Sequence, residues 1–384
     1  MAKINDFLKN LLIIFCSVII MLIILEIGFR IFYSEGKYKN TSIENERVFQ
    51  KSEYLPWVLK PNSRDAKISP YGDYNVTLEI NSYGIRDYEM LISDKSKKIL
   101  VLGDSMTYGQ GVEMNETYPK YLERMLNKRE DYQVFNGGYA ASHSIDSYYL
   151  YLKKEGLQKF KPSIVVIGFF VYDDITDVSL NNWVERKNGL PEKIESKVYD
   201  IEDSRLVRKR GIIFKYPELR KLYGYLLYKS RFFNYVKNTI SDIILTSSSN
   251  RIFDKQLNND IFGQFETDKK ILIATNEFLK KNNAELIILV LPVKFQIYDD
   301  AWEEYSAKIG KDALSRTKPD DLIKEFGAEN KIKVVDLYEV FHEKNKKTPL
   351  FLKVDGHLNS EGHKITAEEI YKSIKKSGAS DGKN

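Results

Sequence analysis

Short runs of apolar residues recur along most of the chain, and stretches with helical periodicity separate them. Such runs are typical of parallel strands that are buried on both faces of a sheet. The predicted strands cover residues 99–102, 133–135, 163–171, 285–291 and 331–336. Because strands alternate with helices, we expect an α/β fold of three layers, with helices on both faces of a parallel sheet of about five strands.

The first 33 residues hold a long apolar stretch. Residues 11–25 carry no charge, and with residues 26–33 they make a helix of about 34 Å at about 1.5 Å per residue, enough to cross a bilayer. Lys3 and Lys9 precede the stretch and favour a cytoplasmic N-terminus. A cleaved signal peptide competes with this interpretation, but no Ala-x-Ala-like site follows. We therefore expect a transmembrane anchor over residues 1–33 and an extracytoplasmic location for the rest of the chain.

Changes of pattern divide the remainder. Residues 34–96 are predicted to be a tether and a small β-rich lead-in, because polar and apolar side chains alternate near their end. Residues 97–376 form the main domain, and residues 377–384 are a polar tail. Within the main domain, residues 179–265 break the rhythm, and we expect a helical insertion rich in basic and aromatic side chains. These aromatic residues pack on the main domain in one interpretation, and face a membrane or a glycan in another.

Charge and cysteine content narrow the possible partners. The 384 residues carry a formal net charge of +5, and no block of consecutive basic residues marks a nucleic-acid tail. We expect no nucleic-acid partner; an anionic membrane surface or an acidic glycan fits better. The single cysteine, Cys16, lies in the apolar stretch, so the part outside the membrane has no disulfide and no cysteine-based metal site.

A candidate nucleophile follows the first predicted strand of the main domain. The apolar run of residues 99–102 stops at Gly103, and Asp104 and Ser105 come next. In open α/β sheets, ligands bind at the carboxyl ends of the strands, so Ser105 is placed to project into a crevice. The alternative is an ordinary turn in which Asp104 or Ser105 caps the next helix.

A candidate base and its orienting carboxylate lie close together near the C-terminus. Asp355 stands two residues before His357, just ahead of the last predicted helix. A catalytic serine needs a base that takes its proton and a carboxylate that fixes the tautomer of that base. His363 is a rival base, but it lacks an aspartate two residues before it.

At these residues the chain resembles the SGNH, or GDSL-type, esterase and lipase superfamily. Gly103, Asp104 and Ser105 match the first block of the family, Gly138 is the best candidate for the glycine of the second block, and Asp355 and His357 match the last block. Residues 81–86, 112–119 and 291–298 are similar to a membrane-anchored subgroup associated with bacterial surface polysaccharides. Arg86, in the first of these segments, is expected to have a structural role as a salt-bridge partner, with an anion contact near the site as the alternative.

The resemblance implies a catalytic set of Ser105, His357 and Asp355, with the amides of Ser105 and Gly138 as oxyanion donors. It further implies a serine esterase that acts on O-acyl groups, such as acetyl, of a cell-surface polysaccharide, and possible partners among polysaccharide-assembly proteins. An O-acyltransferase using the same residues is one alternative. A degenerate fold that binds a glycan or an assembly partner without turnover is another. We expect no cofactor and no metal.

The third block is where the chain departs from the family. Asp173 stands where the resemblance places the asparagine of the oxyanion hole. An ionised carboxylate repels an oxyanion, and losing one donor of this kind typically costs about 3–4 kcal/mol of transition-state stabilisation. Asp173 is therefore protonated, or other donors serve, or hydrolysis is weak. A minor alternative is that Asp173, Asp174 and Asp177 bind a hard cation, since clustered carboxylates favour one.

Overall fold

The fold is that of a computed structural model, which describes residues 2–32, 46–69, 72–141, 143–209, 216–233, 235–237 and 251–380. The chain divides into two compact units. Residues 1–43 and 211–247 form the first unit, and residues 44–210 and 248–384 form the second. The candidate site residues all belong to the second unit.

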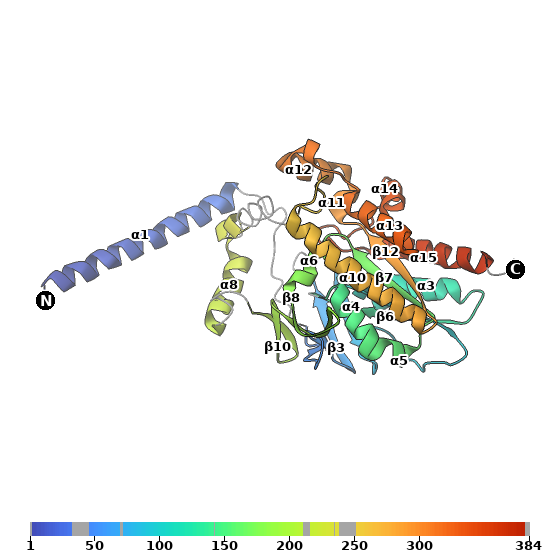
Figure 1. The fold of residues 1–384 in the computed structure, drawn as a ribbon. Helices are drawn as coiled ribbons and strands as arrows, with labels where there is room; N and C mark the ends of the chain where they lie inside the picture. The colour runs from blue at the N-terminus through green and yellow to red at the C-terminus, as the bar shows by residue number, and fades with distance from the viewer. Residues whose placement is uncertain are drawn as a thin grey trace. The chain divides into compact units, whose positions relative to one another are not determined.

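A parallel sheet of five strands lies at the centre of the second unit (Figure 1). It contains β5 (Lys97–Gly103), β6 (Tyr132–Gly138), β7 (Ile164–Phe170), β12 (Glu285–Leu291) and β13 (Lys333–Asp336), in the order β13-β12-β7-β5-β6. All neighbouring strands are parallel. The apolar runs of the sequence are buried in this sheet, which confirms the predicted α/β class and strand number.

Helices cover the sheet on both faces. On one face α10 (Asn259–Lys281) packs along α4 (Ile145–Tyr151), and on the other α3 (Tyr118–Leu126) packs against α15 (Ser360–Ser380) (Figure 1). The chain changes direction after β6, because β6 lies at the edge and β7 lies on the far side of β5. Right-handed crossovers then require opposite faces for α3 and α4. The last helix runs to Ser380, into the predicted polar tail.

The described part of the lead-in contains two small pairs of antiparallel strands. They are β1 (Phe49–Gln50) with β2 (Val58–Leu59), and β3 (Ser63–Ile68) with β4 (Asn75–Ile80). The β-rich character predicted here is confirmed, while residues 33–45, the start of the predicted tether, lie outside the described residues. After β4, the buried guanidinium of Arg86 donates hydrogen bonds to the carbonyls of Tyr108 (2.9 Å), Gly109 (2.7 Å) and Val112 (2.8 Å). Arg86 thus fixes the loop that follows Ser105, which is a structural role.

The helical insertion predicted over residues 179–265 is wrong in its first part. Two hairpins occur there, β8 (Asn181–Lys187) with β9 (Leu190–Ser196), and β10 (Tyr199–Glu202) with β11 (Arg205–Arg208). Asn188 and Gly189 form the first turn with φ of 53° and 77°. An Asn-Gly pair adopts this left-handed conformation easily and is a strong hairpin signal, which the expectation of helix overlooked. The helical expectation holds for α8 (Pro217–Lys229), which belongs to the first unit.

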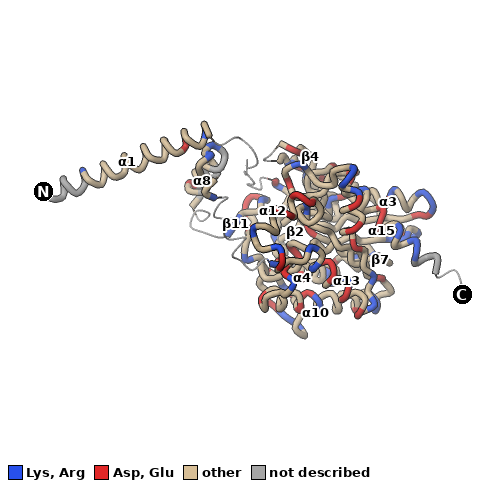
Figure 2. Tube along the Cα trace, turned by 90° about the horizontal axis from the view of Figure 1, so that it is seen from above, with Lys and Arg blue, Asp and Glu red and all other residues tan. Residues whose placement is uncertain are grey.

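The first unit also contains α1 (Ala2–Phe32). Its stretch Lys9–Phe32 is long and apolar enough to cross a membrane, and none of its residues is fully buried. Figure 2 shows it as a tube almost free of charged residues. A signal sequence meets the same criteria, so the length and composition predicted for the anchor are confirmed and its topology stays a prediction.

Candidate active site

Ser105 lies at the carboxyl end of β5, the strand between β7 and the edge strand β6, as its position in the sequence predicted. It is the first residue of the short helix α2 (Ser105–Tyr108), and Asp104 caps this helix by accepting a hydrogen bond from the amide of Met106 (2.9 Å). Gly103 permits the sharp turn: a Cβ there would lie 2.0 Å from Oγ1 of Thr107. The capping interpretation and the nucleophile interpretation are therefore compatible, since Asp104 supplies the cap.

A line of hydrogen bonds joins Ser105, His357 and Asp355. Nε2 of His357 lies 2.7 Å from Oγ of Ser105, and Nδ1 of His357 is hydrogen-bonded to Oδ1 of Asp355. Burial alone would raise the pKa of Asp355, but the hydrogen bond and charge of His357 outweigh it and lower the pKa to about 2. An ionised carboxylate only accepts hydrogen bonds, so Nδ1 carries the proton and a neutral His357 accepts the Ser105 hydroxyl proton at Nε2.

Two residues that the sequence did not single out hold the loop carrying Asp355 and His357. Asp73, in the turn between β3 and β4, accepts hydrogen bonds from the amides of Val354 (3.2 Å) and Asp355 (3.0 Å). Lys294, three residues after β12, donates to the carbonyls of Leu352 (2.6 Å) and Lys353 (2.9 Å). Lys294 lies in a segment noted for its family resemblance, whereas no local pattern marks Asp73.

The other histidines take no part in this arrangement. His363 is buried on α15 and accepts a hydrogen bond from the amide of Tyr118 (3.2 Å), and burial lowers its pKa to about 3. His143 is buried beside Trp57, whose carbonyl lies 3.1 Å from its ring nitrogen. His342 contacts Asp299. The rival base His363 is therefore a packing residue.

Gly138 is the last residue of β6, beside Gly103, but its amide already donates a hydrogen bond within the protein. It pairs with Gly103 in the register of β5 and β6, and a Cβ at Gly138 would lie 2.2 Å from the amide nitrogen of Tyr108. The close approach of α2 therefore requires glycine at this position. The amide of Gly138 donates to Oδ1 of Asn136 (3.1 Å), so it can serve an oxyanion only after Asn136 releases it.

Asp173 interacts electrostatically with His357 and with Asp104. It precedes the short helix α6 (Asp174–Asp177) at the end of β7. Burial raises the pKa of Asp173 to about 6, although the charge of His357 opposes the shift. Burial, followed by the charge of Asp173, raises the pKa of Asp104 to about 7. Near neutral pH these two carboxyls therefore titrate together beside the Ser105–His357 pair.

Two further acidic residues, Asp174 and Asp268, are buried. Asp174 is buried and accepts hydrogen bonds from the amide of Phe170 (2.8 Å) and the hydroxyl of Tyr148 (3.3 Å). Asp268, on α10, is also buried, and neither of its oxygens has a hydrogen-bond partner among the described residues. In the described part of the chain, no group of three or more histidine, cysteine or acidic residues is placed to hold a metal ion. The alternative of a cation site at Asp173, Asp174 and Asp177 therefore has no geometric support there.

Comparison with known families agrees with the last block in the sequence. Residues 253–384 match the family described as "SGNH hydrolase-like domain, acetyltransferase AlgX". This match confirms the predicted SGNH superfamily over the C-terminal third of the chain, which includes Asp355 and His357. It supports a hydrolase or an acyltransferase in general terms. No curated protein matches the chain.

Several solved structures are similar at low identity. The acetyl xylan esterase AlAXEase is 13% identical, with a TM-score of 0.38, and the likeness covers 72% of this chain and 99% of that one. The lipase/acylhydrolase from Enterococcus faecalis is 16% identical, with a TM-score of 0.39, over 73% and 96% of the two chains. A catalytic mutant of Axe2, an acetylxylan esterase from Geobacillus stearothermophilus, is 12% identical, with a TM-score of 0.38, over 74% and 96%. TM-scores this low add nothing to the assignment.

The buried carboxyl of Asp268 gives a prediction for stability. Burial and the charge of Asp174 raise its pKa well above the usual value, so the folded protein binds this proton more tightly than the unfolded chain does. The unfolding free energy of the wild type then falls as pH rises above about 4, and the loss continues up to the folded-state pKa. Asp268→Asn cannot titrate, so we expect it to be more stable than the wild type by at least about 1 kcal/mol at pH 8. The difference should shrink toward pH 4.

Urea unfolding in detergent micelles, followed by circular dichroism at several pH values, measures this difference. Glu277→Gln, an exposed position on the same helix, is the matched control and should show no such trend. Parallel pH profiles for Asp268→Asn and the wild type would contradict the prediction.

Proposed function

We propose that the protein is a serine acyl-transfer enzyme in which Ser105 is the nucleophile, His357 the general base and acid, and Asp355 the residue that orients His357. The hydrogen-bonded line from Asp355 through His357 to Ser105 carries this proposal. Its support is geometric: the base lies within hydrogen-bond reach of the nucleophile, and a carboxylate fixes the tautomer that accepts the proton. The match to an SGNH hydrolase-like family agrees with it.

The chemistry needs two steps. Oγ of Ser105 attacks the carbonyl carbon of an ester while its proton passes to Nε2 of His357. The bond from that carbon to the alcohol oxygen then breaks, and His357 returns the proton to the departing oxygen, which leaves an acyl group on Ser105. A water molecule or a sugar hydroxyl next gives its proton to His357 and takes the acyl group, which restores the Ser105 hydroxyl.

The negative charge that develops on the carbonyl oxygen must be stabilised. The amide of Ser105 is at the first position of α2, where helix amides have no acceptor within the helix. Gly138 contributes its amide once Asn136 releases it. Asp173 contributes a proton when its carboxyl is neutral, and burial favours that form. A carboxyl kept neutral by burial can thus replace the amide of the family asparagine.

We propose O-acyl groups, in particular acetyl, on a cell-surface polysaccharide as the substrate. The family that matches residues 253–384 is described as an acetyltransferase, which favours acetyl as the acyl group and keeps O-acyltransfer as the second candidate function. The non-catalytic alternative is a fold that binds a glycan or an assembly partner. It is supported by the aspartate at position 173 and by the amide of Gly138, which already donates to Asn136. The intact Ser–His–Asp line favours an enzyme, because a binding protein needs none of it.

The proposed location is the extracytoplasmic side of a membrane, with α1 as a retained anchor. The support is the length and apolar composition of Lys9–Phe32, together with the lysines that precede it. In this location the second unit would meet an acylated glycan and other proteins of polysaccharide assembly.

The central prediction concerns the nucleophile. Ser105→Ala should lower kcat/KM for 4-nitrophenyl acetate by at least about 1000-fold in the detergent-solubilised full chain, because no hydroxyl remains to form the acyl-enzyme. Ser163→Ala, which removes a hydroxyl at the entry to β7, is the matched control and should retain activity. Unchanged turnover by Ser105→Ala would rule out this mechanism.

A second prediction concerns Asp173 and pH. Because the folded pKa of Asp173 is about 6, the wild type gains a negative charge beside the oxyanion as pH rises from 5 to 8. Asp173→Asn keeps a neutral donor throughout. The ratio of variant to wild-type kcat/KM should therefore rise with pH, from near one at pH 5 to roughly tenfold at pH 8. The exposed Asp94→Asn is the control and should give a ratio that is independent of pH. A flat or falling ratio for Asp173→Asn would contradict this role.

A further inference from the structure

The end of α1 is fixed to the segment that follows α8, within the first unit. Both carboxylate oxygens of Glu26 accept hydrogen bonds, from the hydroxyl of Ser230 (2.8 Å) and from the amides of Arg231 and Phe232 (both 3.1 Å). Arg231 to Phe233 form a helical turn. Glu26 therefore satisfies amide groups at the start of this turn, as a capping carboxylate does.

Arg30 completes the connection. Its guanidinium pairs with Glu26 (2.8 Å), as the spacing of four residues predicts, and donates to the carbonyl of Lys229 (2.7 Å), the last residue of α8. The guanidinium of Arg231 in turn donates to the carbonyl of Arg30 (3.0 Å). The ring of Phe29 packs against Tyr235, with centroids 4.9 Å apart. These contacts hold the C-terminal end of α8 at the level of residues 26–30 of α1.

This level corresponds to the outer boundary of a bilayer if α1 spans one. The apolar stretch Lys9–Phe32 has 24 residues, or about 36 Å of helix, against about 30 Å of hydrocarbon. Glu26 lies about 26 Å from Lys9 along the helix, so the contacts of Glu26 and Arg30 fall where the chain leaves the hydrocarbon. An ionisable residue in such a helix is costly unless it is paired, and the pairing of Glu26 explains how it is accommodated here.

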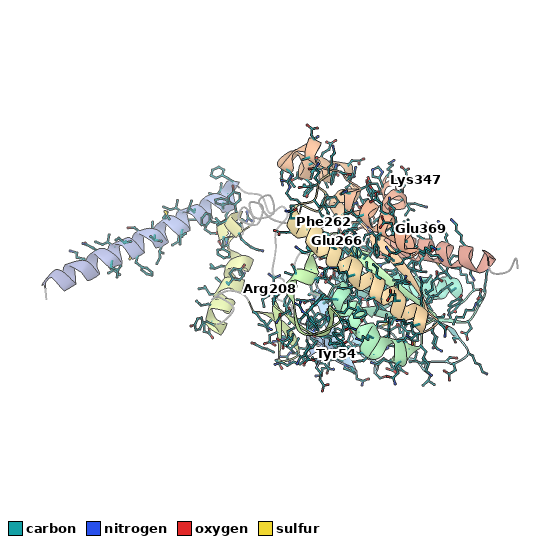
Figure 3. The ribbon with its side chains drawn as sticks, viewed as in Figure 1. Tyr54, Arg208, Phe262, Glu266, Lys347 and Glu369 are labelled. Carbon is teal, nitrogen blue, oxygen red and sulfur yellow. The ribbon has the colours of Figure 1, made fainter. Side chains whose placement is uncertain are left out.

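One face of α8 is apolar and uncovered. Leu219, Leu222 and Tyr225 expose 41%, 53% and 61% of their surface, and their spacing of three residues places them along one ridge of the helix. Most side chains of Lys9–Phe32 are likewise exposed along α1 (Figure 3), apart from residues near its end that contact the segment after α8. A protein in water rarely leaves two adjoining apolar helix surfaces exposed within one compact unit.

We propose that α8 lies in the membrane interface, with Leu219, Leu222 and Tyr225 inserted at the boundary between headgroups and acyl chains of the bilayer that α1 spans. The continuity with α1 through Glu26 and Arg30 selects lipid as the occupant of this face. A tyrosine at this depth keeps its ring among the acyl chains and its hydroxyl among the headgroups. The first unit is then a membrane anchor to which both α1 and α8 contribute. This inference rests on the proposed anchoring by α1, and is independent of the chemistry at Ser105.

Spin labels on single cysteines test the proposal in the full-length protein. Cys16, the single native cysteine, reports whether α1 spans the bilayer. Leu222→Cys and Tyr225→Cys, each in a Cys16→Ser background, report on α8, and Glu343→Cys on the exposed side of α14 (Tyr338–Asn345) serves as the aqueous control. The protein is reconstituted in vesicles of phosphatidylcholine and phosphatidylglycerol. Electron paramagnetic resonance then measures collisions of each label with oxygen and with a water-soluble nickel chelate.

We expect the ratio of oxygen to nickel collisions at Leu222→Cys and Tyr225→Cys to be several-fold higher than at Glu343→Cys, and lower than at Cys16. A ratio equal to that of Glu343→Cys would place α8 in water and overturn the proposal. Few collisions with either reagent would mean that protein covers this face, which also overturns it. An aqueous ratio at Cys16 would refute the anchor itself, so that failure is distinguishable from a failure of α8 alone.

Glu26→Ala examines the connection separately. Without the carboxylate, the turn at Arg231 loses its acceptor, so the collision ratio at Tyr225→Cys should fall toward the aqueous value. An unchanged ratio would show that Glu26 does not hold α8 at the interface.

Discussion

The contact between Nε2 of His357 and Oγ of Ser105 joins two residues that are 252 positions apart in the chain. It forms because β5 ends at Gly103 at the carboxyl edge of the sheet, next to the central strand β7, and because the loop after residue 351 returns to the same edge. Parallel strands gather their carboxyl ends at one edge, so residues distant in the sequence can meet there. The proposed chemistry depends on this contact, and every other feature of the site orients it or adjusts its charge.

Elements outside the five-stranded sheet fix the loop that carries His357. Asp73, which lies in the hairpin β3–β4, accepts hydrogen bonds from two amides of this loop. Lys294, which lies after β12, donates hydrogen bonds to two carbonyls of the same loop. Side chains therefore bind both kinds of polar group in the backbone of the loop: a carboxylate accepts from its amides, and an ammonium group donates to its carbonyls. Such support keeps a base close to its productive position, where small displacements reduce the rate strongly. The β-rich lead-in is thus part of the architecture of the site.

The sequence was sufficient to predict the sheet and the three residues of the hydrogen-bonded line. Buried parallel strands consist of continuous apolar residues, and the Asp-x-His spacing places both groups on one loop. The hairpins β8–β11 were not predicted, although the Asn188–Gly189 turn is a strong hairpin signal. The hydrogen bonds of Asp73 to the loop of His357 and the electrostatic interaction of Asp104 with Asp173 join distant segments, which no local pattern encodes.

Covalent labelling of the full-length protein by a fluorophosphonate, followed by peptide mass spectrometry, tests the central claim most directly. A fluorophosphonate reacts with a serine whose proton an adjacent base removes, and it needs neither the natural acyl donor nor the polysaccharide. The account predicts one adduct per chain, located on Ser105, and its loss in His357→Ala. An unlabelled Ser105, or equal labelling with and without His357, would contradict the claim that these residues form a nucleophile and its base.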